Sequence, residues 1–492
     1  MRFCVVSLLP CKTIFSHAHY ILFTLVMGWI IQANKKSVLV IYILSCLLTA
    51  CQNSKPAKAG PVETYSLNAI SRDYDSQWEG ILKASDGNVY FASSTHSYRH
   101  GAGVFKFNPA TKKLTVLAED ITRVVGEDPG KTPPQGKIHS PFVEASGWIY
   151  FTTHISTYWK NAIDTYTGAH VVGYEMATGK FKDFGIIKSR YTIYSAINVD
   201  PDRGLLYVFL TPFADEDKKN DRAHLYSIDI KSGEKTDLGR LAVDWGKHLL
   251  GSLYFFMHKN GDLWFSVWSD DGQLYKYSPT SKKIERFANV LPSARLAPDG
   301  KPAPQTEWAT SWTWAQALPG NEKCVFSMGY YGGGDERLWL FDPSKKLEEG
   351  EAFQPLAYTG TNFLSMALGG NRVYFVQKAN IAAARGYDTE SERDKDPDKF
   401  GYNEDLHLRS VSLNSEENKV VLDHGLIIDK KGRKLRMSES LAADDNGNIY
   451  LVGSWYLLKG EKGTLMHRYG KIEPGPMEEV KRGEFFGVMK IK

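Results

Sequence analysis

The chain has 492 residues, of which 42% are hydrophobic and 24% are charged, as in ordinary globular proteins with a large core. Residues 1–50 contain four bases and no acid, so 56 of the 60 Lys and Arg residues remain in the rest of the chain, against 56 Asp and Glu. This neutral balance excludes a strongly basic binding protein, and we expect no nucleic-acid partner.

The first elements in chain order are those of a leader. Asn34-Lys35-Lys36 precede an apolar run over residues 37–48, and Thr49-Ala50-Cys51 follow it. This pattern resembles a bacterial lipoprotein signal, with Leu48-Thr49-Ala50-Cys51 as the lipobox. The resemblance implies an exported protein that is lipid-anchored at Cys51 to a bacterial membrane, which we expect to be the outer membrane.

Residues 1–50 form this signal, and translation starting at Met27 would remove an apolar stretch that such a signal does not need. The run after Lys36 is short for a transmembrane anchor, which is the alternative. Residues 51–62 read as a flexible tether. Cys324 is then the one cysteine of the remaining chain, so no intrachain disulfide framework is expected there.

The body repeats a short strand that carries an aromatic residue at a fixed place, at intervals of about 60 residues. Its copies lie at residues 87–91, 147–151, 204–208, 261–265, 323–326, 371–375 and 447–451. Each copy belongs to a unit of four antiparallel strands with Gly- or Asp-rich turns. This predicts an all-β fold, a seven-bladed β-propeller over residues 63–492. Two stacked β-sandwiches would not explain so regular a spacing between the repeated strands. Either residues 63–68 or residues 485–489 would complete the last blade.

The second blade contains two histidines that a hairpin would bring together. A turn centred on residues 144–147 places Thr152 opposite His139, and His154 then lies on the same sheet face as His139. The two imidazoles would be diagonal neighbours, close enough to hold one sugar ring between them. Two polar residues at a strand end, without catalytic function, are the alternative interpretation.

The rim of a propeller where the innermost strands begin is the expected place for a functional site. Matching the blades puts these residues at the inner strand openings: Trp78, His139, Tyr194, Tyr254, Trp314, Leu364 and Met437. The rim also collects bases from several loops: His96, Arg99, His100, Lys188, Arg190, Arg222, Lys247, His248, Arg337, Lys430, Lys431, Arg433, Lys434 and Arg436. Aromatic rings can stack on sugars, and clustered bases attract a polyanion, although either set can also be plain packing or solvated loops.

These residue types suit the β-elimination of a uronate-containing polysaccharide. A base removes the C5 proton, a cation neutralises the carboxylate, and an acid protonates the departing C4 oxygen. Histidine suits the base, tyrosine can serve as base or acid, and arginine would stabilise the developing charge.

The paired histidine segments 137–141 and 150–154 resemble those of the propeller-type ulvan lyases, which cleave a sulfated rhamnose–uronate polymer. The resemblance extends over most of residues 70–455. It implies catalytic roles for His139, His154 and Tyr194, with Tyr191 and Tyr254 as alternative tyrosines. The third-blade position equivalent to His154 is Thr211, so the expected arginine is missing there, and Arg222 is the substitute, with Arg190 behind it.

Substrate contacts are expected from the remaining rim residues, namely Trp78, Arg99, Arg190, Tyr191, Tyr254 and Trp314. We expect a monomer whose catalysis requires no cofactor. A structural zinc or calcium ion is a further expectation from the resemblance, but the candidate ligands His170, His224, His248, His258 and Cys324 are scattered. The rival function is a non-catalytic surface lipoprotein that binds glycans or proteins on the same rim.

Overall fold

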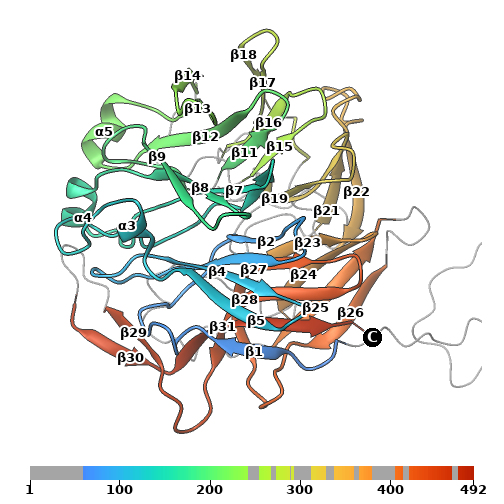
Figure 1. The fold of residues 1–492 in the computed structure, drawn as a ribbon. Helices are drawn as coiled ribbons and strands as arrows, with labels where there is room; N and C mark the ends of the chain where they lie inside the picture. Colours follow the sequence, from blue (N-terminus) through green and yellow to red (C-terminus); the bar gives the residue numbers. More distant parts are fainter. Residues whose placement is uncertain are drawn as a thin grey trace, which may run out of the picture. The chain divides into compact units, whose positions relative to one another are not determined.

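A computed structural model describes residues 59–194, 196–241, 254–267, 273–288, 290–292, 312–328, 337–359, 365–378, 405–413, 420–467 and 475–491 (Figure 1). The expected leader and lipidation site at Cys51, most of the tether, and the rim positions Lys247, His248 and Leu364 lie outside these ranges. Within the described ranges, no helix has the length and apolar character to span a membrane.

The predicted seven-bladed β-propeller is confirmed. Seven sheets of four antiparallel strands follow one another along the chain (Figure 1). The first three blades are built from β2 (Ile81–Lys83), β3 (Val89–Ser93), β4 (Gly103–Asn108) and β5 (Lys113–Ala118); β6 (Val143–Ala145), β7 (Trp148–Thr152), β8 (His170–Glu175) and β9 (Phe181–Ile186); and β11 (Ile197–Asp200), β12 (Leu205–Pro212), β13 (His224–Asp229) and β14 (Lys235–Arg240). In the third blade a short β10 (Tyr191–Thr192) also pairs with β12.

The next three blades have the same order. They consist of β15 (Phe255–Met257), β16 (Leu263–Ser266), β17 (Leu274–Ser278) and β18 (Lys283–Phe287); β19 (Trp312–Ala317), β20 (Cys324–Met328), β21 (Arg337–Phe341) and β22 (Phe353–Tyr358); and β23 (Ser365–Gly369), β24 (Arg372–Lys378), β25 (Leu406–Ser412) and β26 (Val421–Leu426). The described part of the chain also has short helices in the connections, α3 (Ile121–Val124), α4 (Lys160–Thr165) and α5 (Asp215–Asn220).

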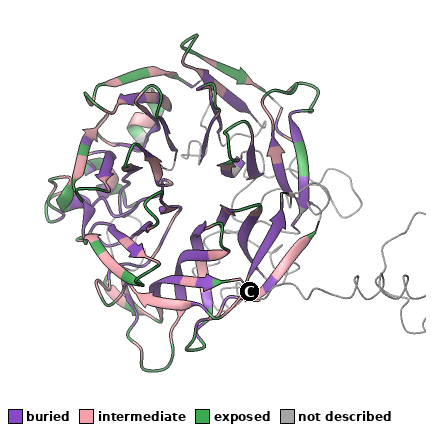
Figure 2. Ribbon diagram, turned by 45° about the vertical axis from the view of Figure 1, so that its right-hand side comes forward, coloured by how far each residue is buried: buried purple, intermediate pink, exposed green. Residues whose placement is uncertain are grey.

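Contacts between first strands join the blades. In order, β6 contacts β11, β11 contacts β15, β15 contacts β19, β19 contacts β23, β23 contacts β27 and β27 contacts β2. Figure 2 shows buried residues along the inner strands, whereas most positions of the outer strands are intermediate or exposed. The core therefore lies between neighbouring blades, and residues that open the first strands are brought towards one another.

The seventh blade uses both chain ends of the propeller. It consists of β27 (Leu435–Ala443), β28 (Asn448–Tyr456), β31 (Arg482–Lys490) and β1 (Glu63–Ser66), with the hairpin of β29 (Thr464–His467) and β30 (Met477–Val480) inserted before β31. Both segments left open by the sequence take part, because β31 is the third strand and β1 pairs with it as the fourth.

Phe486 on β31 fastens this closing blade to the first blade. Its ring stacks on Phe91 with a centroid distance of 4.4 Å, and the Phe107 ring lies 4.8 Å away. We expect Phe486→Ala to lower the free energy of unfolding by about 3–5 kcal/mol, because a fully buried ring leaves a cavity at the seam. Urea denaturation checks this, with exposed Val116→Ala as the control. Equal stability of the two variants would show that the packing of Phe486 on the first blade does not stabilise the closed propeller.

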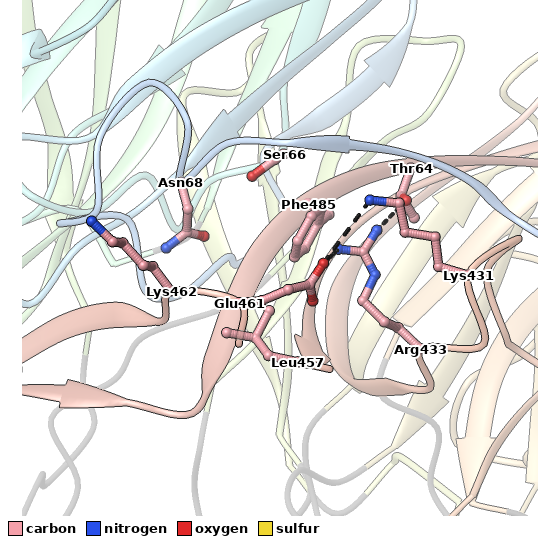
Figure 3. A pocket seen from close by; sticks show the side chains of 9 residues that line it. All are labelled: Thr64, Ser66, Asn68, Lys431, Arg433, Leu457, Glu461, Lys462 and Phe485. Atoms are coloured by element: carbon pink, nitrogen blue, oxygen red, sulfur yellow. Dashed lines mark hydrogen bonds and ion pairs between the residues drawn. The ribbon is translucent and has the colours of Figure 1, made fainter. Parts of the chain in front are cut away.

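A cleft of about 310 Å³ lies beside this seam (Figure 3). It is lined by Thr64, Ser66, Asn68, Lys431, Arg433, Leu457, Glu461, Lys462 and Phe485. The Arg433 guanidinium is buried, stacks over Phe485 and pairs with Asp429 and Glu461. Other bases of this stretch are also paired, Lys430 with Glu63 and Lys434 with Asp405. These bases thus stabilise the closure of the propeller, and the cleft has no histidine or tyrosine in its lining.

Candidate active site

The hairpin of the second blade differs in register from the prediction near its turn. Val143 pairs with Tyr150, two positions from the predicted pairing, because Ser146 and Gly147 form a two-residue turn with φ of 51° and 81°. Farther out, Lys137 pairs with His154, as the predicted register requires. Pro141 lies between the two segments and has no backbone N–H to continue the ladder. The far end of the hairpin, which carries the histidines, therefore has the predicted pairing.

The approach of the chain to this pairing requires a glycine. A Cβ atom at Gly136 would lie 2.3 Å from the Ser156 side chain and 2.9 Å from the Thr95 carbonyl oxygen. The Gly136 carbonyl accepts a 2.7 Å hydrogen bond from the Thr95 amide. The first blade thus packs directly on the segment that carries Lys137 and His139, and this places their side chains between blades.

His139 is enclosed by two aromatic rings. Trp78 stacks on it with a centroid distance of 4.1 Å and an interplanar angle of 12°, and the Tyr194 ring lies 4.3 Å away. The imidazole is buried, and its Nε2 atom makes no hydrogen bond with the residues that the structure describes. Burial, and then the nearby His154 and Lys137, lower the pKa of His139 well below its usual value. His139 is therefore a neutral imidazole with an unpartnered nitrogen.

His154 lies beside it, with a centroid distance of 5.3 Å between the two imidazoles. Its Nδ1 is hydrogen-bonded to the Thr192 hydroxyl, and its Nε2 is 3.0 Å from the Tyr158 hydroxyl. Burial lowers the pKa of His154 well below its usual value, with a further contribution from Lys137. With both nitrogens engaged, His154 is fixed in orientation more firmly than His139.

Tyr194 completes the predicted trio. Its ring lies 5.3 Å from that of His154 as well as close to His139, so His139, His154 and Tyr194 do come together. Tyr158, whose hydroxyl contacts His154, is a site residue that the sequence did not reveal. It lies in the loop after the histidine, outside the repeated strand pattern, and it is 46% exposed.

A third histidine joins the cluster from the first blade. The ring of His96 meets Trp78 edge-on at 5.5 Å, and its Nδ1 is 2.9 Å from the buried Asp75 carboxylate. Burial lowers the pKa of His96, while Asp75 opposes that shift. The sequence identified His96 only as one of many bases on the rim, since Asp75 and His96 are 21 residues apart and nothing in their spacing indicates a pair.

Three predicted residues, Arg190 before β10, Tyr191 on β10 and Arg222 after α5, have partners within the third blade. The Tyr191 hydroxyl donates to Asp221 and accepts from Lys188, at 2.6 and 2.7 Å. Arg190 pairs with Asp217 at 3.0 Å. Arg222 donates to the carbonyls of Lys218 and Asp221 at the end of α5. These contacts give Tyr191, Arg190 and Arg222 partners within the protein, whereas we expected Tyr191 and Arg190 to contact substrate and Arg222 to act in catalysis.

Two other predicted rim aromatics are buried in the core. Tyr254 is 8% and Trp314 4% exposed, with ring centroids 5.5 Å apart. The Tyr254 hydroxyl is hydrogen-bonded to the Glu79 carboxyl, whose pKa is raised by burial and by the charge of Glu439. Packing between blades thus covers these rings. Arg99, in contrast, is an exposed side chain, 3.6 Å from Asp73.

The described candidates for ligands of the expected metal ion lie in separate environments, and His248 lies outside the described ranges. His170 lies between Glu127 and Asp183, which help to raise its pKa to about 9 against the effect of burial. Cys324 is buried, which raises its pKa. Within the ranges of the chain given above, no three His, Cys, Asp or Glu side chains converge on a common point.

Comparison with known proteins finds no matching family and no curated relative. Among solved structures, the chain is similar to oligogalacturonate lyase from Vibrio parahaemolyticus, with 9% identity, 88% of this chain and 97% of that chain covered, and a TM-score of 0.45. An oligogalacturonate lyase in complex with manganese has 11% identity and a TM-score of 0.42, with 89% of this chain and 98% of that chain covered. The β-propeller domain of Myceliophteria thermophila Cps50 has 10% identity and a TM-score of 0.45, with 89% of this chain and 100% of that domain covered. At these identities the likeness concerns the propeller fold alone.

Proposed function

We propose that the protein is a polysaccharide lyase that cleaves a sulfated, uronate-containing polysaccharide such as ulvan by β-elimination. One observation carries this proposal: the buried Nε2 of His139 has no hydrogen-bond partner and lies in a cluster with His154, Tyr194 and Tyr158. A buried polar atom without a partner costs free energy, and such atoms recur where a protein binds or transforms a ligand.

In the proposed reaction the neutral His139 accepts the proton from C5 of the uronate. The electrons of that C–H bond form the C4=C5 double bond as the C4–O bond breaks, and the departing oxygen takes a proton from a phenol. Tyr194, beside His139, is the proposed acid. His154, held between Thr192 and Tyr158, positions the cluster. The stacked Trp78 covers His139, so its ring must shift as the sugar enters.

The remaining parts of the proposal follow from the sequence. The protein would be exported, anchored through a lipid at Cys51 and active as a monomer without a cofactor. The enclosure of His139 between two rings also favours a second candidate, a surface lipoprotein that binds glycans without cleaving them.

One assay separates the two candidates. We expect incubation of the purified protein with ulvan to produce a rise in ultraviolet absorbance from the unsaturated uronate. Heparan, chondroitin and pectic polymers test the substrate class, and heat-denatured protein is the control. Binding of ulvan with no absorbance rise from any of these polymers would favour the non-catalytic candidate.

A further inference from the structure

Lys137 is a buried cation with an unusual environment. The residue is 1% exposed, and its Nζ lies 3.7 Å from the ring centroid of Tyr158 and 5.2 Å from that of Trp78. Among the ion pairs and hydrogen bonds of the described residues, none involves this ammonium group. Asp75 is close enough to attract it, yet does not form an ion pair with it.

Burying an ammonium group without a counterion is costly, and the faces of two aromatic rings offset only part of that cost. Arg433 is another buried cation of this chain and offers a comparison. Its guanidinium also lies over an aromatic ring, but it forms ion pairs with Asp429 and Glu461. Lys137 has the rings without the carboxylates. The environment therefore lacks one component, an anion beside Nζ.

The position of Lys137 indicates which anion this is. Lys137 pairs with His154 across the hairpin and precedes His139 by two residues, so it comes from the same short segment as the proposed base. A group held at Nζ thus lies beside the place where a proton is removed. In a uronate, the carboxylate is bonded to C5, the carbon that loses the proton, whereas a sulfate ester has no fixed relation to that carbon.

We propose that the Lys137 ammonium binds the carboxylate of the uronate that is cleaved, between Tyr158 and Trp78. This inference rests on the proposed function. It gives Lys137 the role expected of an arginine, while Arg222 is bonded to carbonyls at the end of α5. For the carboxylate to reach the buried Nζ, the exposed Tyr158 ring must move, which releases its hydrogen bond with His154.

Carboxylate binding at Lys137 would also act on the base. The charge of Lys137 is one of the causes that lower the pKa values of His139 and His154. A bound carboxylate cancels that charge, so both imidazoles become more basic when the substrate is in place. The same contact stabilises the negative charge that develops on the carboxylate as C5 loses its proton.

The test measures binding separately from turnover. Full-length protein carrying His139→Asn, which cannot act as the base, is titrated by calorimetry with a glucuronate-containing ulvan tetrasaccharide. The carboxyl-reduced and the desulfated tetrasaccharides are titrated in parallel. Each titration is repeated with the double variant that also carries Lys137→Met. A second double variant with Lys137→Gln tests whether the methionine changes packing. Lys259→Met, which removes an exposed cation that pairs with Glu322 and is not one of the rim bases, is the matched control.

We expect Lys137→Met and Lys137→Gln to weaken binding of the acidic tetrasaccharide by about 10- to 100-fold and to leave binding of the carboxyl-reduced one within about twofold. Unchanged affinity for the acidic ligand in both variants would overturn the proposal. So would a loss of affinity that follows the sulfate rather than the carboxylate. Carboxylate-selective binding that depends on Lys137, in a protein without lyase activity, would refute the proposed function and leave this inference standing.

Discussion

Replacing His139 by asparagine is expected to lower kcat for β-elimination by about 10²- to 10⁴-fold, the usual contribution of a general base. Asparagine keeps the polar shape between Trp78 and Tyr194 but cannot accept the proton from C5. Absorbance of the unsaturated uronate under single-turnover conditions measures the effect. Circular dichroism of the variant establishes that the propeller remains folded.

The control is a histidine outside the cluster, which is hydrogen-bonded to a backbone carbonyl. His467 is hydrogen-bonded to the Gly475 carbonyl in the inserted β29–β30 hairpin, and His467→Asn should leave kcat unchanged. Undiminished activity of His139→Asn would move the base to another residue, and His96 is then the next to test because Asp75 orients its imidazole.

The pH dependence gives a second readout of the same base. The base form is the neutral imidazole, so activity falls as pH decreases through the pKa of His139. Because that pKa lies well below 6.5 in the free protein, kcat/KM should stay level from pH 7 down to below pH 6.5. The acid limb of kcat should lie at higher pH, because the bound carboxylate offsets the charge of Lys137. Coinciding limbs would argue against that coupling.

Lys137→Met is expected to raise the free energy of unfolding at pH 7 by roughly 3–5 kcal/mol, an unusual direction for a change in a buried segment. Burial lowers the pKa of Lys137 from 10.5 to about 7, so the folded protein bears the cost of a desolvated ammonium. Methionine has a similar length and no charge, and it can pack against the same two rings.

The pH dependence of this gain has a definite sign. Between pH 7 and about pH 10.5 the unfolded chain binds a proton at Lys137 that the folded protein does not, so the wild-type protein becomes more stable as pH rises. The advantage of Lys137→Met should therefore shrink by about 1.4 kcal/mol per pH unit across that window. Urea denaturation at pH 7, 8, 9 and 10 measures it, with the exposed Lys259→Met as the control. A variant that is less stable than wild type at every pH would show that Lys137 has a compensating partner.

The two Lys137 predictions belong together. A cation that destabilises the folded protein but improves binding of an acidic sugar has a functional reason to be there, since stability and activity often compete at such positions. A purely structural lysine would show the opposite combination, with lower stability on substitution and no change in carboxylate selectivity.

The repeat pattern and local strand alternation predict the architecture and the central pair of the site. Blades are made of hairpins, whose strands are close in sequence, so their turns and aromatic positions recur visibly along the chain. His139 and His154 also belong to one hairpin, and local alternation was sufficient to place them together. Tyr194 followed because the inner strands of successive blades begin at equivalent places.

The surroundings of that pair depend on tertiary contacts. Trp78 lies over His139 and near Lys137 through packing between blades, for which the order of residues gives no spacing rule. Asp75 beside His96 and Tyr158 beside Lys137 join loop residues of one blade that the repeat pattern does not mark. Packing between blades also buries Tyr254 and Trp314, and loop contacts within the third blade engage Arg190, Tyr191 and Arg222. A repeat therefore fixes which residues reach the rim, whereas burial and the partners across the blades fix which of them remain available for chemistry.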